Sequence, residues 1–209
     1  MSQAALRYLA LGDSYTIGTG ASHPSRNFPS LLAWKLEAAT GRQVDLQNPA
    51  VHGYATVDLL REEAPHLGSF RPQLVTLLIG VNDLVDGVSE GDYRNRLRGI
   101  VAAVYRQLEP SRTALIAIPD FSLAPAASRF GDPADLQARL ERFNAIADEQ
   151  ARRAGSPYVD IVPISREGAR RPGWFAEDQL HPGDAQYSAW AEVMWQLLGP
   201  VWTSAVARL

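Results

Sequence analysis

Two short motifs contain the residue types that nucleophilic catalysis needs. Ser14 closes the stretch "YLALGDS", and Asp178 and His181 stand three positions apart in "DQLH". A serine hydroxyl is a poor nucleophile unless a neighbouring base takes its proton, and that base needs a partner that orients it. One short turn can present two side chains at this spacing. We therefore predict Ser14 as the nucleophile, His181 as the base, and Asp178 as the carboxylate that fixes the imidazole tautomer.

Two more motifs could supply hydrogen-bond donors for the negative oxygen of a tetrahedral intermediate. Gly53 ends "NPAVHG", and Asn82 stands in "GVND". The backbone of Gly53 could approach a ligand closely because glycine has no Cβ, and the side-chain amide of Asn82 is also a donor. Together with the backbone N–H of Ser14 near a helix N-terminus, these groups form the predicted oxyanion hole.

Each motif also has a purely structural explanation. Ser14 could cap a helix, Gly53 could mark a turn, and the Asp178 and His181 pair could cap a helix or form half of a metal site. Caps and turns do not explain why the four motifs follow four of the five apolar runs of strand length. The predicted strands are Leu6 to Leu11, Gln43 to Gln47, Leu74 to Ile79, Thr113 to Ile118 and Tyr158 to Ile161.

The segments between these runs have the period of amphipathic helices. The clearest stripes run from Tyr93 to Leu108, from Leu136 to Ala147 and from Trp190 to Leu197. Alternating strands and helices predict a three-layer α/β/α sandwich with a flavodoxin-like, mostly parallel five-stranded sheet, in one domain over residues 1–209. Ligands bind such sheets beyond the carboxyl ends of the strands, where the motifs lie.

The four motifs, in this order, resemble those of the SGNH hydrolases, also called GDSL-type lipases and esterases. The family's blocks are a GDS serine, a glycine in an Asn-x-x-x-x-Gly stretch, a GxND asparagine and a DxxH pair, which correspond to Ser14, Gly53, Asn82, Asp178 and His181. The resemblance spans nearly the whole chain. It implies hydrolysis of carboxylic esters or thioesters through an acyl-enzyme intermediate, without a cofactor or a metal.

Other interpretations explain fewer of the motifs. In the α/β-hydrolase fold the nucleophile stands in G-x-S-x-G, but here Thr16 occupies the position of the second glycine. A flavodoxin-like module could bind a phosphate or a flavin on "SYTIGTG", which leaves Asn82 and the "DQLH" motif without a role. A protein that only binds acylated ligands would not need every catalytic position. A metal-dependent hydrolase would need a denser cluster of ligands.

Composition excludes several classes of protein. The net charge is −3 and the basic residues are scattered, which argues against nucleic acid as a partner. The chain has no cysteine, so thiolate chemistry and disulfides are excluded. No run of about 18 apolar residues predicts a membrane span, and the first residues do not have the form of a signal peptide. We expect a cytoplasmic protein, although removal of a signal peptide would leave the same sequence.

Substrate choice is expected to reside in the loops beyond the strands. These loops include "PDFSLAPAASRFGDP" and "REGARRPGWFAEDQ". Their large apolar residues either line an acyl pocket or pack the loops down, and the candidates are Phe121, Leu123, Trp174 and Phe175. The chain has no apolar lid segment, so we expect a small-molecule ester with a short acyl chain. The sequence does not choose among lipids, thioesters and sugar acetates.

Overall fold

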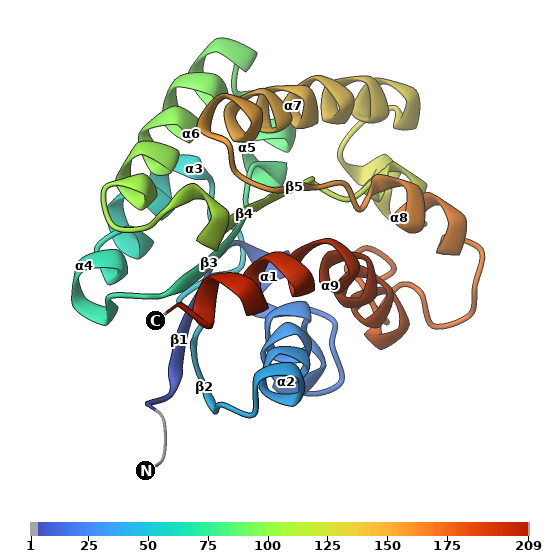
Figure 1. Ribbon diagram of the computed structural model, residues 1–209. Helices are drawn as coiled ribbons and strands as arrows, with labels where there is room; N and C mark the ends of the chain where they lie inside the picture. The colour runs from blue at the N-terminus through green and yellow to red at the C-terminus, as the bar shows by residue number, and fades with distance from the viewer. Residues whose placement is uncertain (1–3, 209) are drawn as a thin grey trace.

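Five short apolar segments pair into one sheet in the computed structural model, which describes residues 4–208. The strands are β1 (Leu6–Gly12), β2 (Val44–Gln47), β3 (Leu74–Leu78), β4 (Thr113–Ile116) and β5 (Tyr158–Val159). They are ordered β2-β1-β3-β4-β5, and every neighbouring pair is parallel (Figure 1). This is the flavodoxin-like order, and it confirms the predicted fold class, with a sheet that is parallel throughout.

The central strands are largely apolar, with one buried threonine each in β3 and β4, because helices cover both of their faces. All five residues of β3 are buried. The last strand is shorter than predicted and ends at Val159 instead of Ile161. There the Asp160 carboxylate accepts the backbone N–H of Val162 at 2.9 Å, which turns the chain into the next helix.

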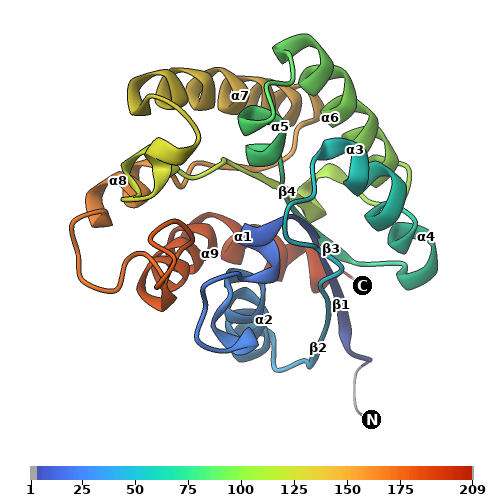
Figure 2. The ribbon, with the colours of Figure 1, turned by 180° about the vertical axis from the view of Figure 1, so that it is seen from behind.

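Helices form a layer on each face of the sheet, with α2 and α9 on one side and α6 and α7 on the other (Figures 1 and 2). The helices are α1 (Ser14–Ile17), α2 (Phe28–Thr40), α3 (Thr56–Asp58), α4 (His66–Phe70), α5 (Val81–Val85), α6 (Glu90–Tyr105), α7 (Pro133–Ala154), α8 (Val162–Gly168) and α9 (Asp184–Val206). A π-helical turn, Leu59–Glu63, joins α3 to the segment before α4.

The three predicted helical stripes fall on α6, α7 and α9 and face the core, except that Leu197, at the end of the α9 stripe, is 43% exposed and the neighbouring Leu198 is buried instead. Aromatic pairs hold the helices and the sheet together. Tyr93 of α6 stacks on Phe143 of α7 within one helical layer, with ring centroids 4.3 Å apart, and Tyr8 of β1 meets the edge of Trp202 of α9 at 5.5 Å. No helix was predicted between the first two strands, where α2 lies. The sequence does contain a signal for the start of this helix, because Asn27 is a residue type that caps helices and it caps α2.

No helix within residues 4–208 is long and apolar enough to cross a membrane. The carboxyl ends of the strands all lie at one edge of the sheet, because the strands are parallel. The first turns of α1 and α5 follow β1 and β3 at this edge. Ser14 and Asn82 therefore lie on neighbouring strand exits.

Candidate active site

The turn that holds Ser14 is fixed by the two residues before it. Ser14 is the first residue of α1 and is 5% exposed. The Asp13 carboxylate caps the helix by accepting the Tyr15 N–H at 3.0 Å. Gly12 has no room for a side chain, since a Cβ there would lie 2.2 Å from the Leu78 carbonyl oxygen. The N–H of Ser14, at the helix N-terminus, has no intrahelical acceptor, so the turn presents a hydroxyl and a free donor together.

The motif "DQLH" forms a turn that is held by its own carboxylate. Asp178 Oδ1 accepts the backbone N–H groups of Leu180 and His181, each at 2.9 Å, while its Oδ2 lies 2.5 Å from His181 Nδ1. Gln179 adopts a left-handed conformation, with φ of 61°, that lets the chain turn this tightly. Burial alone would raise the pKa of Asp178, but the hydrogen bonds from His181 and Leu180 outweigh it and hold the pKa below its usual range.

This arrangement directs the other imidazole nitrogen of His181 away from Asp178. His181 is 8% exposed, and its ring packs edge-on against Tyr15 with centroids 6.3 Å apart. The backbone of the turn is held too, because the Gln179 carbonyl accepts the Ala126 N–H at 3.0 Å. The histidine is therefore confined to one orientation before any substrate binds.

The remaining two motifs are joined to each other by a hydrogen bond. The Asn82 Nδ2 amide, on α5, donates to the Tyr54 carbonyl at 2.8 Å. A primary amide has two N–H groups, so the second remains available to a ligand. Gly53 precedes Tyr54 in an exposed turn.

The reason for glycine at position 53 differs from the one expected. A Cβ added to Gly53 would meet no protein atom within 4 Å, so crowding by the protein is not the cause. Its φ is 85°, a left-handed conformation that side chains disfavour. The turn geometry requires the glycine here.

A buried carboxylate fixes the loop after β2 against α5. Asp83 is 0% exposed and accepts hydrogen bonds from the Thr56 N–H at 2.8 Å and the Thr56 hydroxyl at 2.5 Å. Arg96 of α6 lies 3.3 Å from the same carboxylate. The loop that carries Gly53 and the helix that carries Asn82 therefore share one rigid frame.

Three of the five residues predicted for the triad and the oxyanion hole line one cavity of about 40 Å³. Ser14, Asn82 and His181 form its polar side, and its other walls are Tyr15, Val81, Val85, Phe121, Phe130 and Leu180. Gly53 does not line the cavity. Within residues 4–208, no hydrogen bond joins Ser14 to His181, although both residues line the cavity.

The predicted acyl-pocket residues are divided by the structure. Phe121 lines the cavity. Phe175 instead lines a neighbouring open hollow of about 530 Å³ together with Asp178. Leu123 is 46% exposed, whereas Trp174 is 2% exposed and packs against Gly168. Neither residue lines the cavity, so the structure does not place them in the predicted acyl pocket.

Residues that were not predicted from the sequence complete the site. Phe130 occurs in a loop that was named for substrate choice and Val85 is the last residue of α5, but nothing in their types distinguished them. His52 was not among the predicted site residues. It is exposed on its loop, yet its ring lies 5.2 Å from the ring of His181, and its Nδ1 lies 3.3 Å from the Thr19 hydroxyl. In the sequence, the position of His52 directly before the motif residue Gly53 was the feature that could have indicated a place in the site.

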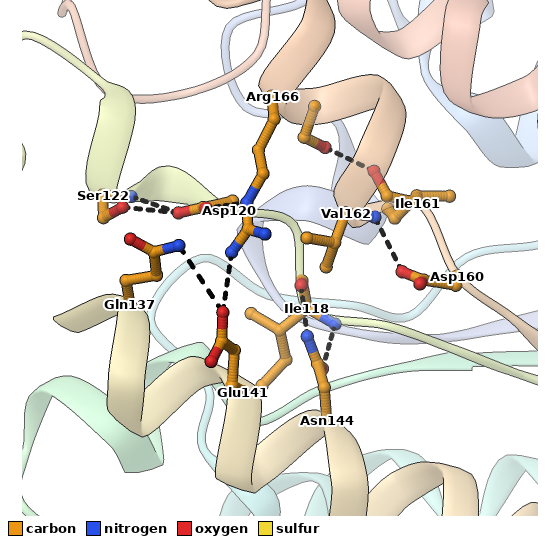
Figure 3. A network of polar contacts seen from close by, with 11 residues as sticks. Ile118, Asp120, Ser122, Gln137, Glu141, Asn144, Asp160, Ile161, Val162 and Arg166 are labelled. Carbon is orange, nitrogen blue, oxygen red and sulfur yellow. Dashed lines mark hydrogen bonds and ion pairs between the residues drawn. The ribbon is translucent and has the colours of Figure 1, made fainter. Parts of the chain in front are cut away.

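A polar network holds the loop that follows β4 (Figure 3). Asp120 is 1% exposed and accepts from the Ser122 hydroxyl at 2.6 Å and from Arg166 Nε, also at 2.6 Å. The Arg166 guanidinium continues to Glu141 of α7 at 3.0 Å. Asn144 holds the start of this loop by exchanging two hydrogen bonds with the backbone of Ile118, two residues after β4, at 2.8 and 2.9 Å. This network positions the aromatic walls of the cavity.

The fold and the groups at its edge define the class: a hydrolytic α/β enzyme with a flavodoxin-like sheet. The chain belongs to the GDSL-like lipase/acylhydrolase family, whose sequence profile matches residues 10–189. Family membership makes it an ester-hydrolysing enzyme and confirms the resemblance drawn from the motifs. A comparison with curated proteins by sequence found no significant match.

Solved structures share the fold over nearly the whole chain. The crystal structure of TesA is 21% identical, with a TM-score of 0.74, and the alignment covers 93% of this chain and 99% of TesA. A lipase/acylhydrolase from Enterococcus faecalis is 19% identical, with a TM-score of 0.75 and coverage of 93% and 96%. The acetylxylan esterase Axe2 from Geobacillus stearothermophilus is 18% identical, with a TM-score of 0.74 and coverage of 95% and 97%.

Substitution of Arg166 by alanine is expected to loosen the loop after β4. The change leaves the buried Asp120 carboxylate without its cation and should lower the free energy of unfolding by about 1–3 kcal/mol, less than for a fully buried pair because Arg166 is half-exposed. Urea unfolding measures this loss, and kcat/KM for an ester should fall with it. Arg152→Ala is the control, since it breaks an exposed pair and should cost less than about 0.5 kcal/mol. Equal losses in both variants would contradict the role of the network.

Proposed function

We propose that this enzyme hydrolyses carboxylic esters with short acyl chains through an acyl-enzyme intermediate on Ser14. The observation that carries the proposal is the single small cavity in which a helix-terminal serine faces a histidine oriented by a carboxylate. Family membership supports ester hydrolysis, and the residues around the cavity support this particular mechanism.

In the proposed mechanism, His181 takes the proton of the Ser14 hydroxyl while Ser14 Oγ attacks the ester carbonyl carbon. The Asp178 carboxylate keeps the proton of the imidazole on Nδ1 and stabilises the imidazolium. The tetrahedral intermediate then collapses, the ester C–O bond breaks, and His181 returns the proton to the leaving alcohol. A water molecule, activated by His181, attacks the acyl-enzyme and releases the carboxylic acid and free Ser14.

The oxyanion is proposed to accept hydrogen bonds from the backbone N–H groups of Ser14 and Gly53 and from the Asn82 side chain. The hydrogen bond from Asn82 to Tyr54 supports this role because it fixes the orientation of the amide. Donors fixed in advance stabilise developing charge without the cost of reorienting during the reaction.

The size of the cavity supports a short acyl group. A group the size of a water molecule needs about 10–15 Å³ of cavity volume, so a cavity of about 40 Å³ holds about three groups of that size. Acetyl to butyryl groups fit this limit. Axe2, one of the similar solved structures, is an acetylxylan esterase, which is consistent with a short acyl group. The alcohol part of the substrate lies outside the cavity in this proposal.

The identity of the nucleophile can be tested by covalent labelling. A fluorophosphonate probe should label the protein once, on Ser14, because Ser14 shares the cavity with His181, whose ring is held by a carboxylate. Ser14→Ala should abolish labelling and turnover, while Ser122→Ala, a buried serine on the loop after β4, should keep the Ser14 label. Mass spectrometry locates the modified residue. Modification of another serine would refute the mechanism.

The role of Asn82 can be separated from a structural role by comparing two variants. Asn82→Ala should lower kcat by about 10²–10³, equivalent to about 2.7–4 kcal/mol, because it removes a donor needed in the transition state. KM should change little. Thr56→Val loosens the same loop without removing an oxyanion donor, so it should lower thermal stability and reduce kcat by less than about tenfold. Similar kcat values for both variants would leave Asn82 with a structural role only.

Acyl-chain preference should follow the walls of the cavity. For p-nitrophenyl esters, kcat/KM should be highest between acetate and butyrate and should fall for octanoate. Phe130→Ala opens one wall and should raise the hexanoate-to-acetate ratio of kcat/KM about tenfold, the lower end of the range for pocket discrimination by a methylene group. Leu123→Ala, on the same loop but outside the cavity, should leave the ratio unchanged. A wild-type preference for octanoate would contradict the proposal.

A further inference from the structure

A buried carboxyl group contacts the end of β1, two residues before Ser14. Glu63 ends the π-helical turn Leu59–Glu63 and is 0% exposed. Its Oε2 accepts a hydrogen bond from the Gly12 N–H at 2.9 Å. The mechanism proposed above gives this residue no part. A glutamate removed from water in this way is rare unless it is paired, so its position requires a cause.

The geometry of the strand explains why Gly12 needs an acceptor there. Alternate residues of a strand direct their N–H groups to the same side. The Leu6 N–H donates to the Gln43 carbonyl on the β2 side of the sheet, so the Gly12 N–H, six residues later, points to that side as well. The pairing of β2 with β1 has stopped by then, at Gln47 opposite Leu9. The glutamate replaces the missing strand at the last N–H of β1.

A second buried carboxyl follows immediately along the chain. Asp13 is also 0% exposed, and its Oδ1 accepts the Tyr15 N–H at the start of α1. Glu63 Oε1 and Asp13 Oδ2 have no hydrogen-bond partner among the described residues. Each acid thus uses one oxygen to bind the backbone of the same turn, and each leaves one oxygen unpaired. Two such groups cannot both be ionised without strong repulsion.

We propose that Glu63 is a positioning residue for Ser14: its protonated carboxyl holds the last N–H of β1 and thereby fixes the turn in which Asp13 caps the nucleophile's helix. This inference rests on the proposed function of Ser14. Glu63 acts through the backbone of Gly12 and does not contact the substrate. Gly12 is packed so closely that a Cβ there would lie 2.2 Å from the Leu78 carbonyl oxygen, and in this proposal a movement of its backbone shifts Ser14, two residues further on, relative to the cavity.

The protonation states of the two acids agree with this arrangement. Burial raises the pKa of Glu63 to about 8, against the hydrogen bond from Gly12, and the charge of Asp13 adds to the rise. Burial also raises the pKa of Asp13 to about 7, against the hydrogen bond from Tyr15, with the charge of Asp83 adding to it. At neutral pH Glu63 keeps its proton, and the turn contains at most one full negative charge.

Other charged groups around the turn are already paired. Asp83, on α5, is the acid that faces Asp13, and it is paired with Arg96 of α6 at 3.3 Å. Arg61, on the same π-helical turn as Glu63, has a side chain that is 66% exposed and pairs with Asp58 of α3 and with Glu62. Among residues 4–208, no cation forms an ion pair with Glu63. Protonation is the remaining way to neutralise it.

Three variants test the proposal through the rate of fluorophosphonate labelling at Ser14 and through kcat and KM for a short-chain ester. Glu63→Gln keeps an oxygen acceptor for Gly12 and should stay within about twofold of the wild type. Glu63→Leu removes the acceptor and should lower both the labelling rate and kcat about tenfold, which lies within the loss that a misplaced reacting group causes. KM should change less than about threefold. Glu62→Gln, one residue away and exposed, is the control and should match the wild type.

The outcomes distinguish failure of this inference from failure of the proposed function. If the wild-type protein is not labelled on Ser14, the proposed mechanism itself fails. If Ser14 is labelled but folded Glu63→Leu reacts at the wild-type rate, the positioning role is overturned while the mechanism stands. A Glu63→Gln variant that is labelled slowly and has a low kcat would also overturn the positioning role, because the oxygen acceptor for Gly12 would be present but would not preserve the reactivity of Ser14.

A stability measurement provides a readout that is independent of activity. The raised pKa of Glu63 means that the folded state keeps a proton that the unfolded state releases, so the stability contribution is complete below about pH 4.5 and is lost as pH rises through about 8. Glu63→Gln has no such proton. The melting temperature of Glu63→Gln minus that of the wild type should therefore increase from pH 5 to pH 9. A difference that stays constant with pH would show that Glu63 is not protonated in the folded protein and would overturn the proposal.

Discussion

The sharp turn between β1 and α1 is the constraint on which the rest of the site depends. A strand in a parallel sheet must satisfy its last backbone groups, whereas the nucleophile proposed at its end needs a free hydroxyl and a free N–H. Both needs are met because position 12 is a glycine, which has no side chain, and because the buried carboxyls of Glu63 and Asp13 accept hydrogen bonds from the backbone N–H groups of this turn. Ser14 is thereby held at a helix N-terminus, where donors face outward.

Each of the other polar groups is fixed by a hydrogen bond to a different segment. Asp178 builds the turn that carries His181 and orients its ring with the same carboxylate. Asp83 fixes the loop after β2 to α5, and Asn82 donates to that loop as well. The site is therefore assembled from loops far apart in sequence, each attached by a buried or partly buried acceptor. Such networks restrict motion because an unpaired buried polar group is costly.

The cavity has a different origin from the polar groups. Its walls come from apolar residues of α5 and of the loop after β4, and that loop is held by the Asp120 and Arg166 pair (Figure 3). Loops tolerate substitution better than the sheet that carries them. In the proposed mechanism, the polar groups at the edge of the sheet set the type of reaction and the loop after β4 sets the size of the acyl group, so these two properties can change independently.

The sequence by itself determined the architecture and the set of polar residues. Apolar runs of strand length and helical stripes depend on local periodicity, so the five strands and the helices α6, α7 and α9 could be predicted from it. Motifs after four strands could be assigned to one edge because parallel strands end together.

Only the tertiary structure decided which residues meet across the site. Phe130 lines the cavity while Leu123 on the same loop is exposed, and their apolar types do not differ in any way that predicts this. In the sequence, Glu63 resembles a surface acid because it stands beside Glu62. Its buried position follows from the pairing of the strands, because β2 ends before β1 does and leaves the Gly12 N–H for Glu63 to bind. His52 likewise approaches His181 through a contact between distant loops. Contacts of this kind depend on where separate segments pack in space, which local sequence patterns do not encode.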